Sequence, residues 1–546
     1  VLKGQNETYY YSKTNYETSP LSRVISTYAA GNSWAGSESA VNATDRHGMQ
    51  QQYFMNTAVD VVQLWTVSDN AVAGQFGNYS TVSTYPAGEL FKTIIIDEHG
   101  KQVIEFKDKG GKIILKKVQL AGNATDDGSG SNHTGWLCSY YVYDKFNLLR
   151  AMIQPRGVEL LPAAGWQLST DLLNEQCFRY EYDQRHRLSV KKVPGAGEVY
   201  MVYDTRDRLV FTQDANLRGQ GKWLSMLYDE LNRPVVTGLM SYNATLNDLQ
   251  QLVANQTTSP VSIPSGLLAD RTLPESTHSG TYSGDYQALS TITMTDGFET
   301  TPGAAFSATI VNDLGEPVVL IDGQQVNINP LPAGVPFTVL TTTYYDDYSG
   351  ITADGGAAYS SKDNSWDSYF SSSSSWPYPQ TPLQSTATKG LVTGTKTRVL
   401  NVPGDQYLYT ASFYDDKGRV VQTKGSNISG GLDINTTQYS FSGQPLVSVQ
   451  KQQQAGANVQ TNLALSQLTY DDLGRLIKTE KKVSNSLING GNLPAVWTTT
   501  AENQYDALGQ LKTKSLGKQK DINGNYTGTP IETLTHDYNI RGWLLG

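Results

Sequence analysis

The sequence predicts an all-β protein, built as a long antiparallel sheet of repeated hairpins. Three observations predict it: a composition rich in Tyr and Gly, a short motif that recurs along the chain, and a turn-forming residue at the fifth position of that motif. Among the 546 residues are 33 Tyr and 50 Gly, while charged residues make up only 17%. Aromatic and β-branched side chains suit a pleated sheet, so the composition argues against a mostly helical protein.

Charge and hydropathy argue against two further classes. The chain carries 42 Lys and Arg against 51 Asp and Glu, a net charge of −9, whereas a nucleic-acid-binding protein needs a basic surface. The longest apolar runs, such as Ile94–Ile96 and Val318–Ile321, have the length of strands and fall far short of the ~20 residues that span a bilayer. Because the chain starts at Val1 without a secretory signal, we expect both a removed leader and a longer parent protein.

The recurring motif consists of an aromatic residue, Asp, two variable residues, a turn residue, Arg and an aliphatic residue. Six close copies occupy Tyr182–Leu188, Tyr203–Leu209, Tyr228–Pro234, Tyr414–Val420, Tyr470–Leu476 and Tyr505–Leu511. Looser copies begin at Ile96, Tyr143, Val311, Tyr439 and His536. Repetition at this spacing predicts an architecture of stacked structural repeats.

The fifth position of the motif indicates what each repeat forms. It holds residue types that tolerate a positive φ angle, namely His186, Asp207, Asn232, Gly418, Gly474 and Gly509, with Gly100 and Asn147 in looser copies. The Asp at the second position can accept a hydrogen bond from the backbone two residues on and so close a turn. Alternating segments flank each turn, which is typical of a β-hairpin. Because a lone hairpin is marginal in water, we expect the hairpins to pair edge to edge in a sheet that curls or closes.

We interpret the motif side chains as structural. The Tyr supplies an apolar ring with a hydroxyl that can find a partner, and the Arg is placed to pair with the Asp of its own turn or of a neighbouring one. The residues to which we assign this role are Tyr143, Asp144, Tyr182, Asp183, Arg187, Tyr203, Asp204, Arg208, Tyr228, Asp229, Arg233, Tyr414, Asp415, Gly418, Arg419, Tyr470, Asp471, Gly474, Arg475, Tyr505, Asp506 and Gly509.

At these residues the sequence resembles the RHS/YD-repeat family. The stretch from Cys177 through Pro194–Gly197 to Arg233-Pro234 resembles the N-terminal portion of the large exported RHS proteins of Gram-negative bacteria with a type 9 secretion pathway, and His536–Leu544 resembles the segment that leads toward the RHS core. The resemblance implies a sheet wound as a spiral into a partial or complete hollow β-shell, or cocoon. Family members enclose a C-terminal, often toxic, polypeptide in such a shell, and others are cell-surface or adhesion proteins. An Asp-Pro-rich core motif and a cargo domain are absent from these residues, so we expect them in the longer parent.

We divide the chain into four regions. Residues 1–90 are expected to form an N-terminal β-rich region or plug, residues 91–240 a first repeat block, and residues 411–546 a second block that leads toward the RHS core. Residues 241–410 carry Ser, Thr, Gly and Pro clusters, and we favour degenerate repeats with long polar loops there over an independently folded insertion. Helical spacing over residues 247–253 predicts one helix in this region.

Patterns of known catalytic sites are missing from the sequence. The six histidines (His47, His99, His133, His186, His278 and His536) are scattered, and neither a nucleophile elbow nor a phosphate-binding loop occurs. We interpret His186 as a positive-φ turn residue rather than a ligand. The run from Asp521 to Glu532 has the spacing of a calcium loop, but Tyr526 replaces the required Gly, so we favour a hairpin turn at Asn523-Gly524. We therefore predict no catalytic, cofactor-binding or metal-binding residue, although sequence alone leaves a glycosidase-like carboxylate pair open.

Two cysteines and three loop aromatics complete the set of candidates. Cys138 and Cys177 stand at equivalent places in two repeats, at least two strand spacings or ~9.5 Å apart, whereas a disulfide needs Cα atoms within ~7 Å. We expect two unpaired, half-buried thiols. The repeat tyrosines are expected to pack in the sheet, while Trp366, Trp376 and Tyr378 are more open to a binding role.

The function that the sequence favours is a non-enzymatic shell of a secreted or cell-surface bacterial protein, which encloses or presents another polypeptide. The expected partners are the rest of its own polypeptide, namely C-terminal repeats, core and cargo, and secretion machinery or other surface proteins; neither a nucleic acid nor a membrane span is expected. Two alternatives remain open: a surface adhesin or carbohydrate-binding protein, and a secreted glycan-active enzyme.

Overall fold

The protein is described here by a computed structural model covering residues 9–32, 47–72, 74–255, 268–273, 280–282, 284–296, 298–303, 305–310, 318–327, 329–539 and 542–545. The loose motif copy that begins at Val311, and His278, lie outside these described residues. The predicted all-β class is confirmed, because 25 strands belong to one antiparallel sheet. The chain divides into two compact units, residues 1–200 with 345–546 and residues 201–344, and each unit is described by itself.

The first stretch of the larger unit is a ladder of antiparallel strands in which each strand pairs with the next one in the ladder. Its strands are β1 (Lys13–Tyr16), β2 (Val24–Tyr28), β3 (Met49–Met55), β6 (Phe91–Ile96), β7 (Gln102–Lys107), β8 (Ile113–Gln119), β9 (Trp136–Tyr143), β10 (Leu149–Ile153), β11 (Cys177–Tyr182), β12 (Leu188–Lys192) and β13 (Val199–Tyr203). Pairing of β3 with β6 makes the strands before residue 90 part of this same ladder. A separate hairpin comprises β4 (Gln63–Ser68) and β5 (Asn78–Thr84).

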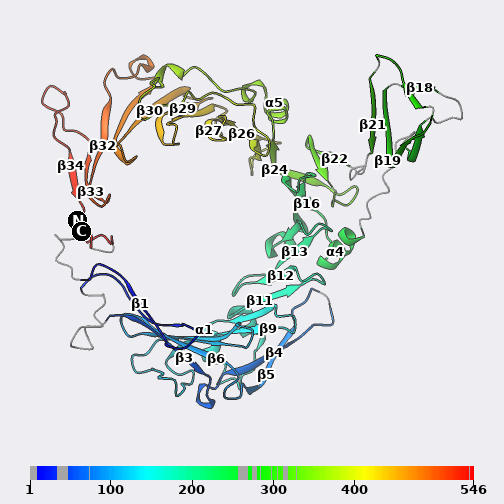
Figure 1. Ribbon diagram of the computed structural model, residues 1–546, viewed down its shortest axis with the longest axis vertical. Coiled ribbons are helices and arrows are strands. Elements are labelled where there is room, and N and C mark those ends of the chain that lie inside the picture. The colour runs from blue at the N-terminus through cyan, green and yellow to red at the C-terminus, as the bar shows by residue number, and fades with distance from the viewer. Residues whose placement is uncertain are drawn as a thin grey trace. The chain divides into compact units, whose positions relative to one another are not determined.

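The second stretch of this unit repeats the arrangement (Figure 1). Its strands are β25 (Val392–Arg398), β26 (Tyr407–Tyr414), β27 (Val420–Ser426), β28 (Leu432–Tyr439), β29 (Pro445–Gln454), β30 (Gln460–Tyr470), β31 (Leu476–Asn485), β32 (Thr498–Tyr505), β33 (Leu511–Leu516) and β34 (Glu532–Thr535). Every consecutive pair is antiparallel. The helices of the larger unit are α1 (Pro155–Leu160), α2 (Thr170–Glu175), α5 (Ser349–Gly355), and the short 3-10 turns η4 (Ala58–Asp60), η5 (Ala357–Tyr359), η6 (Asp367–Tyr369) and η7 (Asn489–Gly491).

The smaller unit contains a shorter antiparallel ladder of β14 (Leu209–Gln213), β15 (Lys222–Tyr228), β16 (Pro234–Ser241) and β24 (Phe337–Tyr345). Its other elements are the helices α3 (Ala215–Gly219) and α4 (Leu246–Ala254), and the strands β17 (Leu268–Leu273), β18 (Gly280–Tyr282), β19 (Gly284–Met294), β20 (Phe298–Thr300), β21 (Phe306–Ile310), β22 (Val318–Ile321) and β23 (Gln324–Asn327). Strands β17, β19 and β21 pair in parallel, as do β18 and β20, which a hairpin connection cannot produce.

The predicted helix over residues 247–253 is confirmed as α4. Thr245 caps its first turn: the Thr245 hydroxyl accepts from the Asp248 N–H at 3.2 Å, while the Asp248 carboxylate accepts from the Thr245 N–H at 2.9 Å. This reciprocal pair satisfies two backbone donors at the helix start. Leu246, Leu249 and Val253 form its buried face, as the helical spacing of apolar residues requires.

The described motif copies all form the same type of turn. In the copy at Tyr414, the Asp415 N–H donates to the Arg419 carbonyl, and the Gly418 N–H donates to the Asp415 carbonyl. The strand register shifts between Phe413 and Tyr414. This pattern is that of a β-hairpin with a three-residue loop, in which the last loop residue has a left-handed backbone conformation and lies beside a β-bulge. The φ angles of the fifth-position residues confirm the predicted turn residues: 61° at His186, 63° at Asp207, 61° at Asn232, 73° at Gly418, 78° at Gly474, 81° at Gly509, 76° at Gly100 and 68° at Asn147.

The structure corrects the motif assignment at the end of the chain and adds copies. The last turn is counted from Tyr538 rather than from His536, because the Asn539 N–H donates to the Trp543 carbonyl and the Asn539 side chain accepts from the Trp543 N–H. The same turn also occurs at Asp108, Asn427 and Asp521. These three copies lack an aromatic residue at the first position and Arg at the sixth, so the sequence motif did not reveal them.

Replacing Gly418 by Ala tests the turn geometry. Gly418 has a φ of +73°, and a Cβ added there meets nothing within 4 Å, so the substitution acts through backbone strain alone. We expect Gly418→Ala to lower the free energy of unfolding by about 1 kcal/mol and Gly418→Asn to lower it less, since Asn tolerates this region better. Chemical denaturation of the variants measures the difference, and equal stability of all three proteins would contradict the turn assignment.

Candidate functional site

The second-position Asp carboxylate organises each repeat turn. In the copy at Tyr182, Asp183 Oδ1 accepts from the backbone N–H groups of Arg185 and Arg187 at 2.9 and 3.0 Å, and Asp183 Oδ2 accepts from the Arg187 guanidinium at 2.7 Å. The Asp–Arg pair within one turn recurs at 2.7 Å in the copies at Asp204, Asp229, Asp415 and Asp471. Where Gln510 replaces the Arg, the two backbone bonds to Asp506 remain. The predicted Asp–Arg pairing is therefore confirmed within the turns themselves.

A second contact, between successive hairpins, was not predicted. The Tyr439 hydroxyl donates to the Val420 carbonyl at 3.1 Å, and Val420 directly follows the turn of the preceding hairpin. The same bond runs from Tyr182 to Leu149, Tyr228 to Leu209, Tyr414 to Val392, Tyr470 to Pro445, Tyr505 to Leu476 and Tyr538 to Leu511, at 2.6 to 3.0 Å. The motif Tyr thus ties its own hairpin to the hairpin before it.

The motif Arg also spans two hairpins. The Arg419 guanidinium lies 5.0 Å from the centre of the Tyr439 ring in the next hairpin and donates to the Ser440 carbonyl at 2.9 Å. In the smaller unit, Arg208 lies 5.0 Å from the Tyr228 ring and donates to Asn232 Oδ1 at 3.1 Å. Such cation–π contacts are stronger where the cation is partly desolvated. The same contact joins Arg475 to the Tyr505 ring at 4.8 Å. The Asp–Arg–Tyr set of these three turns, which we call the repeat link, connects one hairpin to the next.

The strength of the repeat link depends on the charge of the Asp carboxylate at its second position. Burial raises the pKa of the Asp415 carboxyl, but hydrogen bonds from the Arg419 N–H and guanidinium outweigh that effect and hold its pKa below the usual value. A carboxylate whose pKa is lowered on folding stabilises the protein above its unfolded pKa near 4, and this contribution is lost as pH falls through the lower folded pKa. The turn is thus strongest at neutral pH.

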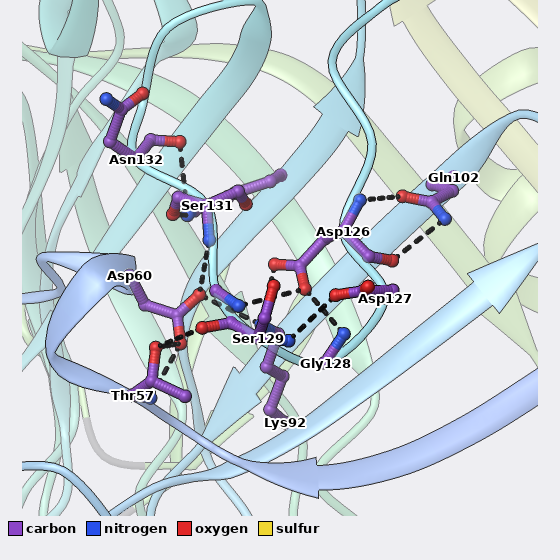
Figure 2. A network of polar contacts seen from close by, with 12 residues as sticks. Thr57, Asp60, Lys92, Gln102, Asp126, Asp127, Gly128, Ser129, Ser131 and Asn132 are labelled. Carbon is purple, nitrogen blue, oxygen red and sulfur yellow. Dashed lines mark hydrogen bonds and ion pairs between the residues drawn. The ribbon is translucent and has the colours of Figure 1, made fainter.

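The most buried ionic group lies in the larger unit, under the loop between β8 and β9. Lys92 Nζ on β6 donates to Asp60 Oδ1 at 2.9 Å and to Asp126 Oδ2 at 2.6 Å, and all three side chains are fully buried (Figure 2). Burial raises the pKa of Asp126, but the bond from Lys92 and the Gly128 N–H more than offset this and leave its pKa lowered. The triad holds the loop onto the sheet.

Neighbouring polar side chains hold the backbone of the same loop, residues 120–135. Asp60 Oδ1 accepts from the Ser131 N–H at 3.1 Å, and Lys117 Nζ on β8 donates to the Ser131 carbonyl at 2.6 Å. Burial lowers the pKa of Lys117 to about 8, but the amine is enclosed and committed to the loop. Figure 2 shows Asp60 and Lys92 beneath the loop, with Asp60 bonded to the Ser131 backbone of the loop itself. This arrangement stabilises structure and offers no accessible nucleophile.

The other titratable candidates of the sequence lie in repeat turns or in the packed core. Among the described residues, no group of three or more His, Cys, Asp or Glu side chains could hold a metal ion. His133 Nε2 lies 2.8 Å from the Tyr140 hydroxyl, and burial lowers the pKa of His133 to about 4. His186 has a left-handed backbone, as predicted. Asp521 accepts from the N–H groups of Asn523 and Asn525, so the calcium-like run forms the predicted hairpin turn.

A group of carboxylates surrounds one arginine in the larger unit. Arg150 on β10 contacts Glu181 at 2.5 Å, Asp69 at 2.8 Å and Asp144 at 3.2 Å. All three carboxylates pair with this one guanidinium, which carries a single positive charge, and Asp144 also closes its own repeat turn. The cluster lines a cavity of about 570 Å³, to which Asp183 and His186 also contribute.

The two cysteines lie on strands of successive hairpins. Cys138 and Cys177 are unpaired, as expected, and lie on β9 and β11, with β10 between them. They are fully buried rather than half-buried, because each side chain faces the core. Trp366 packs against the buried Val449, Leu463 and Leu465.

Two of the three loop aromatics are open to solvent. Trp376 is 43% exposed and Tyr378 is 50% exposed, and the two rings meet edge to face. Among the described residues, no helix is long and apolar enough to cross a membrane.

Comparison with known proteins gives limited matches. A family model described as a domain of unknown function, DUF6443, matches residues 2–47. No curated protein matches the chain. Among solved structures, the crystal structure of TcdB2-TccC3-TEV is 11% identical with a TM-score of 0.31, over 98% of this chain and 21% of that chain. The crystal structure of TcdB2-TccC3-Cdc42 has the same identity and TM-score, over 97% of this chain and 21% of that chain. A structure of the Photorhabdus luminescens Tc holotoxin pore is 11% identical with a TM-score of 0.30, over 97% of this chain and 21% of that chain. The chain thus spans about a fifth of the length of these chains.

Replacing Arg419 tests the repeat link. Arg419→Lys keeps the charge but cannot bond Asp415 and Ser440 at once while lying on the Tyr439 ring. We expect Arg419→Ala and Arg419→Lys to lower the free energy of unfolding by about 1–2 kcal/mol and to speed hydrogen exchange in β28. Arg156→Lys is the control, since Arg156 forms only an exposed pair with Glu159. Normal exchange in β28 of both Arg419 variants would contradict the link.

Replacing Lys92 tests the buried triad. Lys92→Met leaves Asp60 and Asp126 buried without their cation, which should lower the free energy of unfolding by about 3–5 kcal/mol and raise the pKa of Asp126. Lys109→Met is the matched control, because Lys109 pairs with Glu89 on the surface. We expect this control variant to have the same free energy of unfolding as the unmodified protein. Thermal unfolding and proteolysis of the loop measure the effect, and equal behaviour of the two variants would refute the assignment.

Proposed function

We propose that this chain is the non-enzymatic β-shell of a secreted or cell-surface RHS/YD-repeat protein, which encloses or presents another polypeptide. The observation that carries the proposal is the repeat link. It joins successive hairpins by the same three side chains in both units, for example at Asp415, Arg419 and Tyr439 and at Asp204, Arg208 and Tyr228. Side chains used in this way build a continuous wall rather than a reaction centre.

The distribution of polar groups supports the same role. The buried ionic groups of the larger unit, such as Lys92, Lys117 and Arg150, all bond to other parts of the chain. They therefore hold loops and turns in place. The resemblance of the repeats to exported RHS proteins supports the proposals of secretion, of a type 9 pathway, and of a longer parent whose C-terminal portion is the enclosed partner.

Protease protection tests the function. An unstructured, uncharged polypeptide rich in Ser, Thr, Ala and Gln is fused after Gly546 of the whole chain, and its cleavage by a nonspecific protease is followed over time. We expect cleavage to be at least tenfold slower than for the same polypeptide fused to a small globular carrier, because access is restricted to rare opening of the wall. Equal cleavage rates in the two fusions would refute enclosure.

A further inference from the structure

Three buried glutamines of the larger unit share one unusual arrangement. Gln422 on β27 donates from Nε2 to the Asp363 carbonyl at 2.9 Å and accepts at Oε1 from the Asp363 N–H at 2.7 Å. Gln438 on β28 makes the same pair of bonds with the carbonyl and N–H of Ser371, at 2.7 and 3.0 Å. Each amide side chain thus holds both backbone groups of a single residue, and we call this arrangement an amide clamp.

The third amide clamp lies in the other stretch of the unit. Gln102 on β7 donates to the Asp126 carbonyl at 3.0 Å and accepts from the Asp126 N–H at 2.8 Å, as Figure 2 shows. In all three clamps a strand supplies the glutamine, and a segment without strand structure crosses the sheet face and supplies the backbone. The clamped residues are Asp363, Ser371 and Asp126, so the contact does not depend on one side-chain type.

The crossing segment over β27 and β28 is the strap, residues 346–391. Besides its two clamps, the Lys424 ammonium donates to the carbonyls of Ala358 and Ser361 at 3.0 and 2.7 Å. Trp366 and Phe370 of the strap pack on the sheet residues Val449, Leu463 and Leu465. The sheet face therefore holds the strap mainly through its backbone, with a few apolar anchors.

The same face continues past the strap. Gln438 is paired across the sheet with Val447, Val447 with Gln467, and Gln467 with Glu480. Directly opposed residues point to the same face, so Gln467 lies in the row of Gln438, two strand spacings or about 9.5 Å away. The Gln467 side chain is partly exposed and has no hydrogen-bond partner among the described residues.

The side chains beside Gln467 on the same face of β31 are charged, and Lys482 among them donates to the Ala495 carbonyl at 2.7 Å. Glu480 beside Gln467 pairs with Lys478 at 2.7 Å, and Thr469 lies further along the same face of β30. An amide that is free to donate and accept suits the N–H and carbonyl of one residue, as it does at Gln422 and Gln438.

We propose that the face of β30 and β31 around Gln467 binds a polypeptide in extended conformation through its backbone, with Gln467 as a fourth amide clamp. The surface is continuous with the one on which the strap already lies, and the occupant is recognised by its peptide groups rather than by its side chains. This inference rests on the proposed function, since it names how an enclosed polypeptide of arbitrary sequence contacts the wall.

Site-specific photocrosslinking tests the clamp. A photoreactive residue replaces Thr469 in the whole chain, and the free form of the uncharged Ser, Thr, Ala and Gln polypeptide is the probe. We expect crosslinks at position 469, reduced about tenfold by Gln467→Ala, since two side-chain hydrogen bonds to the backbone are lost. Gln450→Ala is the matched control, because Gln450 is exposed on β29 on the opposite face, and the yield should not change.

A competition experiment isolates the backbone contact. A short peptide of the probe sequence should suppress the crosslink, whereas its copy with alternate N-methylated peptide bonds, which lacks those donors, should not. Equal competition by both peptides, or equal crosslinking of the Gln467→Ala variant, would overturn the clamp. If the fused polypeptide is protected while Gln467→Ala has no effect, the enclosure stands and the clamp is wrong. If crosslinking depends on Gln467 without protection, the clamp stands and the enclosure is wrong.

Discussion

The hydrogen bonds to the Asp carboxylate at the second position of the close repeats are the interaction on which the rest of the structure depends. The carboxylate accepts two backbone N–H groups of its own turn and, where Arg follows, a guanidinium as well. The turn therefore closes with its polar groups satisfied, and the Arg is held over the Tyr ring of the next hairpin. Because hydrogen bonds to charged groups are stronger than neutral ones, a short motif can specify both a turn and the contact to its neighbour.

Polar side chains on the sheet have a second role, which is to hold segments that cross it. Lys117 and Gln102 hold the backbone of the loop over residues 120–135, and Gln422 and Gln438 hold the backbone of the strap. A loop laid over a sheet buries backbone N–H and carbonyl groups, each of which is costly if unpaired. Amide and ammonium groups on the sheet satisfy them without demanding a particular sequence in the loop.

Local chemistry was readable from the sequence because it acts over a few residues. The fifth-position residues predicted positive φ angles, and the structure has φ of 61° at His186 and 73° at Gly418. Spacing predicted α4, and strand geometry predicted that Cys138 and Cys177 are unpaired. The turn at Asp521 was predicted from Asn523-Gly524 rather than from the motif. The turns at Asp108 and Asn427 were missed because Lys107 and Ser426 stand where the close copies have an aromatic residue.

By itself, the sequence determined the strand periodicity, the turn type and therefore an antiparallel sheet of hairpins, because these depend on φ preferences and on side-chain bonds within a turn. Only the tertiary structure decided which carbonyl each motif Tyr reaches, which segments lie across the sheet, and that Lys92 sits between Asp60 and Asp126. Those contacts join residues far apart along the chain, and their partners depend on register and packing, which no local pattern encodes.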